Sequence, residues 1–186
     1  MQSKLGQSKP ALVADPSQLG ARYAAVRGLT VDLVAPLSDA DATVQSMEDA
    51  SPAKWHLAHT TWFFETFILR DHVRGYALHD ARFPCLFNSY YEAEGERHAR
   101  TRRGMITRPT LAEVIAYRAA VDAALLAALP GLPVAALELV ALGCHHEEQH
   151  QELLITDILH LFAQNPTEPG IWPAARKVPV EMPGPI

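Results

Sequence analysis

The sequence predicts an all-α protein, a four-helix bundle with a long loop between its second and third helices. Four segments carry apolar residues at gaps of three and four, the spacing that lines one face of a helix. No segment alternates apolar and polar residues as a half-buried strand does. Proline, glycine or capping residues stand where the segments begin or end. Four amphipathic helices of this length favour a bundle around one core.

The first helix is expected to follow Pro16 and to end before Pro36. Its apolar stripe is formed by five residues at helical spacing: Leu19, Tyr23, Val26, Leu29 and Leu33. Residues 38–47, which come next, are acidic and predict a loop with a short turn at most.

The second helix is predicted from Ala53 to about His72. Ser51 is its expected N-cap, and Pro52 suits the first helical position, where a missing N–H group costs nothing. Residues 74–109 lack a sustained helical period and form the long loop. A loop of this length in a compact domain is usually functional or disordered, and its aromatic residues argue against disorder.

Thr110 and Glu113 form a capping-box pattern that opens the third helix, which is expected to run to Leu129. The fourth helix is predicted from near Pro133 to about Phe162 and is the longest element.

The chain therefore divides into three predicted regions. Residues 1–15 are polar and rich in small side chains, and we expect a disordered leader. Residues 16–163 form the helical bundle. Residues 164–186 are rich in proline and predict a tail or a truncated interdomain linker.

The composition excludes several classes of function. Hydrophobic residues make up 48% and charged residues 20%, and the net charge of -5 argues against a nucleic-acid partner. No apolar run is long enough to span a membrane, and the N-terminus lacks the apolar segment of a secretory signal. Two cysteines, Cys85 and Cys144, make no disulfide framework, which suits a reducing compartment. We expect a cytoplasmic protein without a membrane partner.

Two pairs of histidines have a spacing that suits metal ligands. His146 and His150 are four residues apart on the fourth helix and share one face. On the second helix, His59 lies on the inward aromatic stripe, and His56, beside that stripe, is the competing candidate. If the two helices face each other, three imidazoles converge. Three imidazoles suit zinc, iron, nickel or copper and leave positions open, as catalytic sites do.

Carboxylates near these histidines are candidates for orienting them. Asp157 follows His150 by seven residues, shares its face and is the candidate for a hydrogen bond that orients a ligand imidazole. Glu147, Glu148 and Glu152 lie off that face, and we expect them in solvent.

A basic run lies in the long loop: Arg97, Arg100, Arg102, Arg103 and Arg108. It is either a solvated patch or an anion site, because a guanidinium can bind a carboxylate through two parallel hydrogen bonds.

Two histidine-containing segments carry a resemblance to a known family. Ser51–Glu65 (SPAKWHLAHTTWFFE) and His146–Leu154 (HEEQHQELL) resemble the N-terminal DinB-like domain of the ergothioneine-biosynthesis sulfoxide synthases. Leu86–Glu92 (LFNSYYE) and Arg102–Thr110 (RRGMITRPT) are similar to the proteobacterial branch of that family. The resemblance extends from about Arg22 to Phe162.

The resemblance implies a four-helix bundle that holds one non-haem iron(II). By motif position the ligands fall on His59, His146 and His150, although zinc or another divalent ion also suits three histidines. The family uses oxygen to join cysteine or γ-glutamylcysteine to the imidazole of hercynine (N-α-trimethylhistidine) and oxidises the sulfur. Arg100 and Arg103 are the expected binders of a substrate carboxylate.

One departure from the family concerns a second domain. Family members carry a C-terminal domain that resembles formylglycine-generating enzymes, completes the active site and supplies a catalytic tyrosine. A proline-rich stretch stands where that domain would begin, so we expect this chain to lack it, as a fragment or truncated product or as the partner of a separate chain. We expect metal binding with weak or no synthase turnover unless a separate chain, or a second copy in a homodimer, completes the site. A stand-alone thiol-dependent transferase and a non-catalytic metal-binding bundle are the alternatives.

Overall fold

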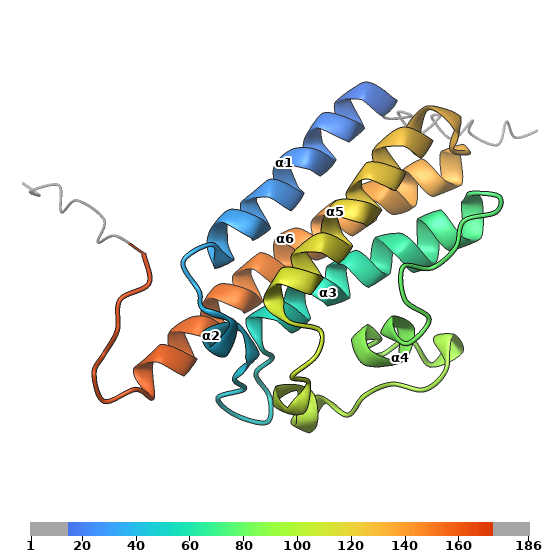
Figure 1. Cartoon of the computed structure of the whole chain (residues 1–186). Coiled ribbons are helices and arrows are strands. Elements are labelled where there is room, and N and C mark those ends of the chain that lie inside the picture. The colour runs from blue at the N-terminus through green and yellow to red at the C-terminus, as the bar shows by residue number, and fades with distance from the viewer. Residues whose placement is uncertain (1–14, 173–186) are drawn as a thin grey trace, which may run out of the picture.

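The computed structural model describes residues 15–172, and all regular structure within that range is helical. Four long helices lie side by side and form the body of the molecule (Figure 1). Their bounds are α1 Pro16–Val34, α3 Ala53–Phe64, α5 Leu111–Ala128 and α6 Val134–Ala163. The predicted all-α class and helix bundle are confirmed.

Short helices occupy the connections between the long ones. They are α2 (Asp39–Thr43), α4 (Phe83–Phe87), η2 (Glu92–Glu94), η3 (Arg100–Met105) and η4 (Leu129–Gly131). A π-helical segment, η1 (Glu65–Arg70), continues α3 to nearly the end expected from the sequence. The long loop therefore holds α4, η2 and η3, and α4 packs against α3.

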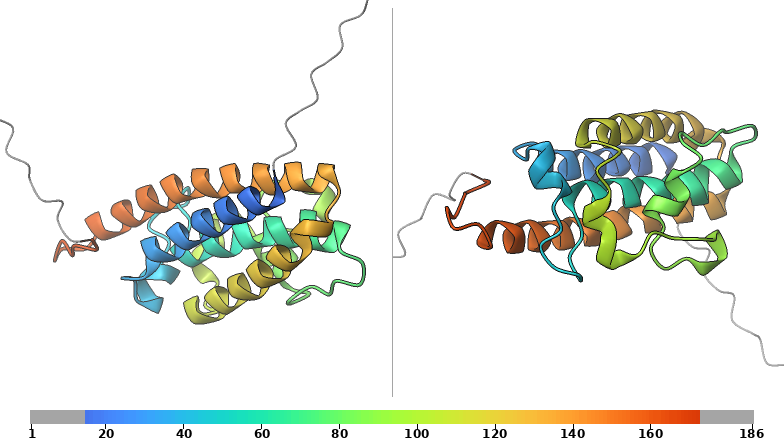
Figure 2. Two further views of the ribbon diagram at one scale, coloured as in Figure 1. Left: turned by 90° about the horizontal axis from the view of Figure 1, so that it is seen from above. Right: turned by 60° about the horizontal axis from the view of Figure 1, so that its bottom comes forward.

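α3 is the central helix of the bundle. It packs against both α5 and α6, while α6 also packs along α1 (Figure 2). Every residue from Ala53 to Phe64 is buried, including two histidines and a lysine. A helix without an exposed stripe must find partners for its polar side chains on its neighbours. The histidines and threonines of α3 find partners on α1, α5, α6 and the long loop, whereas Lys54 Nζ and Trp62 Nε1 have none among the described residues.

A buried ion cluster joins the four long helices, and we call it the polar clamp; its members are Arg27, Thr30, Thr61, Arg118 and Glu147. Glu147 Oε2 accepts from Arg27 Nη1 at 2.8 Å, and Glu147 Oε1 accepts from Arg118 Nη2 at 2.6 Å. Thr30 Oγ1 donates to Glu147 Oε1 at 2.6 Å, and Arg27 Nη2 donates to Thr61 Oγ1 at 2.9 Å.

The expectation that Glu147 lies in solvent was wrong, because its side chain is 0% exposed. Glu147 lies off the face of the fourth helix that carries His146 and His150, and that face alone was expected to be buried. α6 buries a second face against α1, and Glu147 lies on it beside Arg27. Glu152 is exposed, and Glu148 is half-exposed and pairs with Arg22 at the surface.

The predicted capping of one helix start, that of α5, is confirmed, and that of another, α3, is not. The capping box is confirmed: Thr110 accepts from the Glu113 backbone, and the Glu113 carboxylate bonds back to Thr110. Pro52, not Ser51, holds the N-cap position of α3, without a side-chain bond. The Ser51 hydroxyl instead accepts from Arg103 Nη1 at 2.8 Å, because the long loop folds back onto the start of α3.

The leader predicted over residues 1–15 falls almost wholly outside the described range, which excludes residues 1–14 and 173–186. Asp15, at its edge, accepts from the Ser17 backbone N–H at 3.0 Å and is the N-cap of α1.

Gly143 allows α6 to approach α3 closely. A Cβ atom at this position would lie 2.4 Å from Phe64 Cε1 and 3.0 Å from Phe63 Cε1. Both rings belong to α3, so a side chain at Gly143 would force the two helices apart. The close approach occurs one turn before His146 and therefore affects how the histidines of the two helices meet.

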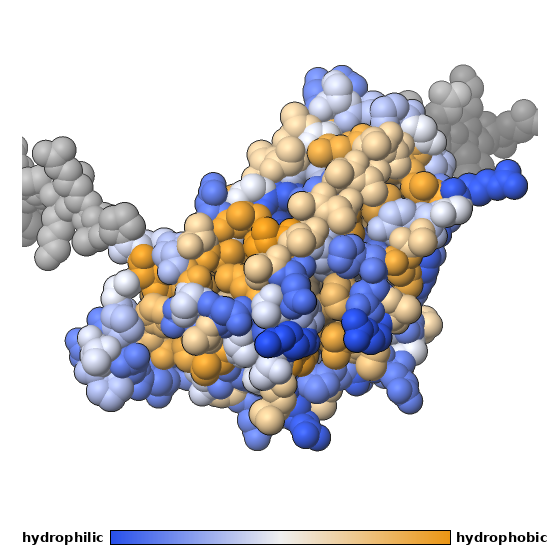
Figure 3. All heavy atoms as spheres, in the orientation of Figure 1, coloured by the Kyte–Doolittle hydropathy of each residue, from blue (hydrophilic) through white to orange (hydrophobic). Residues whose placement is uncertain are grey.

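Hydrophobic residues gather on one face of the molecule where the end of α1 approaches the start of α5 (Figure 3). This shallow hollow is lined by Val31, Val34, Leu37, Leu111 and Ile115, among others. It shares no lining residue with the histidine pocket described below. Within the described range, no helix has the length and apolar character needed to cross a membrane.

Candidate metal centre

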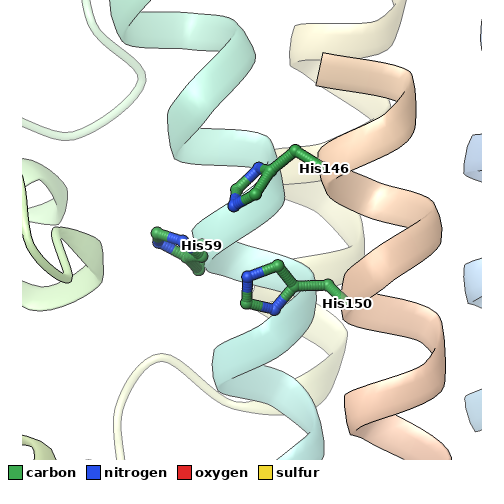
Figure 4. Close-up of side chains that lie close together, drawn as sticks. All are labelled: His59, His146 and His150. Atoms are coloured by element: carbon green, nitrogen blue, oxygen red, sulfur yellow. The ribbon is translucent and has the colours of Figure 1, made fainter. Parts of the chain in front are cut away.

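Three histidines from two helices point toward one another (Figure 4). His59 comes from α3, and His146 and His150 come from α6. One ring nitrogen of each lies within 4.8 Å of the other two. The ring centroids are 5.1 Å apart for His59 and His146, 4.8 Å for His59 and His150, and 4.6 Å for His146 and His150. Helices α3 and α6 thus face each other in the way the spacing required.

A hydrogen bond to the long loop determines which ring nitrogen of His59 carries the proton. Its Nδ1 lies 2.6 Å from the carbonyl oxygen of Phe87, which can only accept, so Nδ1 carries the proton. The Nε2 lone pair is then free for a metal. Burial, with repulsion from His146, lowers the pKa of His59 to about 3, so this imidazole is neutral at physiological pH. Neutral imidazole is the form that binds metal ions.

His150 has a different partner, His56. The two Nδ1 atoms lie 2.9 Å apart, and His56 Nε2 lies 3.0 Å from Asp157 Oδ2. Asp157 is thus in place behind the cluster, but its hydrogen bonds go to His56 and to the Ser51 backbone. The sequence reading placed Asp157 directly on a ligand imidazole; in the structure His56 stands between them.

His146 completes the donor set. Its Nδ1 is buried and has no hydrogen-bond partner among the described residues. Burial lowers the pKa of His146, and burial with repulsion from His56 and His59 lowers that of His150. Three neutral imidazoles, each with one ring nitrogen within 4.8 Å of the others, fit a divalent metal ion well.

The neighbouring His145 takes no part in this group. It lies at the surface, where its Nδ1 is 3.0 Å from Glu148 Oε2. Its position agrees with the helical geometry, which turns adjacent residues about 100° apart.

The sequence profile of the DinB superfamily matches residues 22–154. The chain belongs to the DinB superfamily. The matched region runs from within α1 into α6 and includes His59, His146 and His150. No curated protein matches the chain.

In this DinB-superfamily domain the three histidines line a pocket of about 330 Å³. Further walls come from the long loop and from α3 and α6, and they are mostly polar or aromatic: Ser51, Trp55, Ser89, Tyr90, Tyr91 and Gln149. The pocket gives a small molecule access to the face of the histidine cluster.

Arg103 is a buried cation in the wall of the DinB pocket, only 4% exposed. Its guanidinium donates to the hydroxyls of Ser51, at 2.8 Å, and Ser89, at 3.1 Å, and lies 3.3 Å from the ring centroid of Trp55. Burial, with repulsion from Arg100, lowers the pKa of Arg103 to about 10, so it remains charged at neutral pH. Within the described range it forms no ion pair with a carboxylate.

Arg100 lines the same pocket but is exposed. Its Nη1 donates to the Tyr90 hydroxyl at 2.8 Å, and its Nη2 donates to the carbonyl oxygen of Asp49. The two arginines predicted to bind a substrate thus reach one pocket, with Arg103 in the wall and Arg100 at the surface.

The polar partner that sequence reasoning missed is His56. It was weighed only as an alternative ligand, and its contact with His150 depends on how α3 and α6 are rotated against each other. The sequence feature that could have indicated this contact is that His56 accompanies His59 on one helix, while His146 and His150 form a second pair on the other.

Proposed function

We propose that His59, His146 and His150 bind one divalent metal ion, which is iron(II) in the functional state. We further propose that the domain belongs to an iron(II)- and oxygen-dependent sulfoxide synthase that joins hercynine to cysteine or γ-glutamylcysteine in ergothioneine biosynthesis. The observation that carries the proposal is the convergence of three neutral imidazoles in a pocket that also holds the cation of Arg103, which has no carboxylate partner within residues 15–172. The segments quoted from the sequence support the narrower assignment.

When bound, iron(II) would supply the redox chemistry that couples the reduction of oxygen to the formation of a carbon–sulfur bond. The overall reaction balances with one molecule of oxygen. The thiol S–H and the imidazole C–H bonds are lost as a C–S bond forms. The sulfur gains one oxygen atom, and the other leaves as water.

The residues of the pocket would bind and orient the two substrates. Arg103, assisted by Arg100, would bind a carboxylate, because a buried guanidinium without an ion-pair partner favours an anion. Tyr90 and Tyr91 line the same pocket, and aromatic rings suit the trimethylammonium group of hercynine. Fixing both substrates beside the metal would lower the entropic part of the barrier.

The proposal is tested by assaying the chain under oxygen with iron(II), hercynine and a panel of thiols. Sulfoxide formed from cysteine or γ-glutamylcysteine is the expected product. Because the resembled family completes its site with a second domain, the assay is repeated with such a domain added as a separate chain. Consumption of a thiol without oxygen would instead indicate a thiol-dependent transferase. No product under any of these conditions would leave only metal binding.

The role of Arg103 is tested with a matched pair of variants. Arg103→Gln should weaken binding of the carboxylate-bearing substrate about 10- to 100-fold, the cost of losing a charged hydrogen-bond donor. Arg102→Gln, at an exposed neighbour outside the pocket, should leave it unchanged. Titration calorimetry on the metal-loaded variants measures both. Equal affinities for Arg103→Gln and the unmodified chain would remove Arg103 from the site.

A further inference from the structure

His56, His150 and Asp157 form a continuous chain of hydrogen bonds behind the proposed metal ligands. His56 Nδ1 lies 2.9 Å from His150 Nδ1, and His56 Nε2 lies 3.0 Å from Asp157 Oδ2. The Ser51 backbone N–H donates to the same Asp157 oxygen at 2.8 Å and holds the carboxylate in place. His56 is only 3% exposed, so water does not compete for these bonds.

The acceptor at the end of this chain fixes the position of each proton. A carboxylate oxygen only accepts, so His56 carries a proton on Nε2. A neutral imidazole carries one proton, so with that proton on Nε2 the Nδ1 atom of His56 is a lone pair. That lone pair accepts the proton of His150 Nδ1, and His150 is left with its lone pair on Nε2.

The opposite arrangement would prevent His150 from acting as a ligand in this orientation. If His56 donated from Nδ1, His150 would have to accept at Nδ1 and would carry its own proton on Nε2. No lone pair would then face the cluster. A neighbour that selects the Nδ1–H tautomer therefore favours metal binding before any metal arrives.

We propose that His56 is a positioning residue that, with Asp157 behind it, holds His150 in the Nδ1–H tautomer and directs His150 Nε2 to the metal. This inference rests on the metal site proposed above. The two histidines of α3 then have different roles. His59 is a metal ligand oriented by the Phe87 carbonyl, and His56 orients a ligand on the other helix.

Two substitutions at His56 separate hydrogen bonding from packing. In His56→Asn, the side-chain oxygen stands near the former Nδ1 position and still accepts from His150. In His56→Leu, an apolar side chain fills the site without an acceptor. His56→Leu should lower the affinity for iron(II) or cobalt(II) about 10- to 100-fold, the usual effect of losing an orienting partner, and His56→Asn should restore most of it. Circular dichroism confirms that each variant is folded.

A second readout does not depend on metal at all. Nitrogen-15 spectra of the metal-free protein, labelled at histidine, distinguish the Nδ1–H from the Nε2–H tautomer of each ring. We expect Nδ1–H for His150 and Nε2–H for His56 in the unmodified chain. In His56→Leu the preference of His150 for Nδ1–H should weaken, which a purely structural role of His56 would not cause.

Failure of this inference and failure of the metal site give different results. If the unmodified chain binds no metal, the metal proposal fails, and the tautomer spectra still decide whether His56 orients His150. An Nε2–H tautomer at His150 would overturn the inference, as would equal metal affinity in His56→Leu and the unmodified chain. If His56→Asn loses metal as completely as His146→Ala, His56 is a ligand and not a positioning residue.

Discussion

At the scale of single residues, the buried carboxylate of Glu147 forms ion pairs with two buried arginines, Arg27 and Arg118. Burial alone would raise its pKa, but Arg27 and Arg118 outweigh that effect and lower the pKa to about 2. Asp122 also accepts from Arg27 Nε at 2.7 Å, whereas within the described range Arg118 has no carboxylate partner other than Glu147. Loss of the Glu147 charge would therefore leave Arg118 as an unpaired buried cation.

Glu147→Gln should destabilise the protein by about 3 kcal/mol, because removing one partner of a buried ion pair leaves the other charge uncompensated. Urea unfolding measures the change. Glu148→Gln, one residue away but half-exposed, should change stability by less than about 1 kcal/mol. Equal effects of the two substitutions would show that the polar clamp does not stabilise the fold.

At the scale of helices, the contact between α3 and α6 sets the geometry of the site. Gly143 on α6 meets Phe63 and Phe64 on α3, with no room for a Cβ atom. The histidine contacts follow one to two turns further along α6. The distance between the two helices therefore controls both core packing and the convergence of the imidazoles.

Gly143→Ala should destabilise the protein by about 1–3 kcal/mol through overpacking, even though alanine favours helix. It should also weaken metal binding by moving α6 away from His59. Gly28→Ala is the matched control: Gly28 lies within α1 with nothing within 4 Å of an added Cβ. That substitution should stabilise the helix by about 0.5–1 kcal/mol. Thermal unfolding reports both signs, and a stabilising Gly143→Ala would contradict the close approach.

The sequence was sufficient for the long helices and for the capping box of α5. Helical periodicity located the four long helices, and the Thr110 capping pattern located the start of α5 within a residue. The sequence was insufficient wherever an answer depended on two helices at once. The burial of Glu147 needed the second buried face of α6, and the contact of His56 with His150 needed the rotation of α3 against α6.

At the scale of the whole molecule, buried histidines couple stability to pH. The pKa values of His56, His59, His146 and His150 are all lowered, chiefly by burial. Between the ordinary histidine pKa of about 6.5 and these lowered values, the unfolded chain binds more protons than the folded one. The contribution of these four histidines to the stability of the metal-free protein is thus fully present above about pH 6.5 and decreases as pH falls.

The urea midpoint of the metal-free protein should accordingly fall as pH decreases from about 6.5, with a further loss below about 4.5 as Glu147 becomes protonated in the unfolded chain. The loss below 4.5 should be smaller in Glu147→Gln. Denaturation series from pH 8 to pH 3 measure both windows. A midpoint that stays constant from pH 7 to pH 5 would show that the histidines are not buried as neutral groups.

The central claim is that His59, His146 and His150 bind one metal ion, and anaerobic titration with iron(II) or cobalt(II) tests it most directly. We expect one ion per chain for the unmodified protein, loss of binding in His146→Ala, and unchanged binding in His145→Ala, whose ring lies at the surface. Unchanged binding in His146→Ala, or equal loss in both variants, would contradict the site.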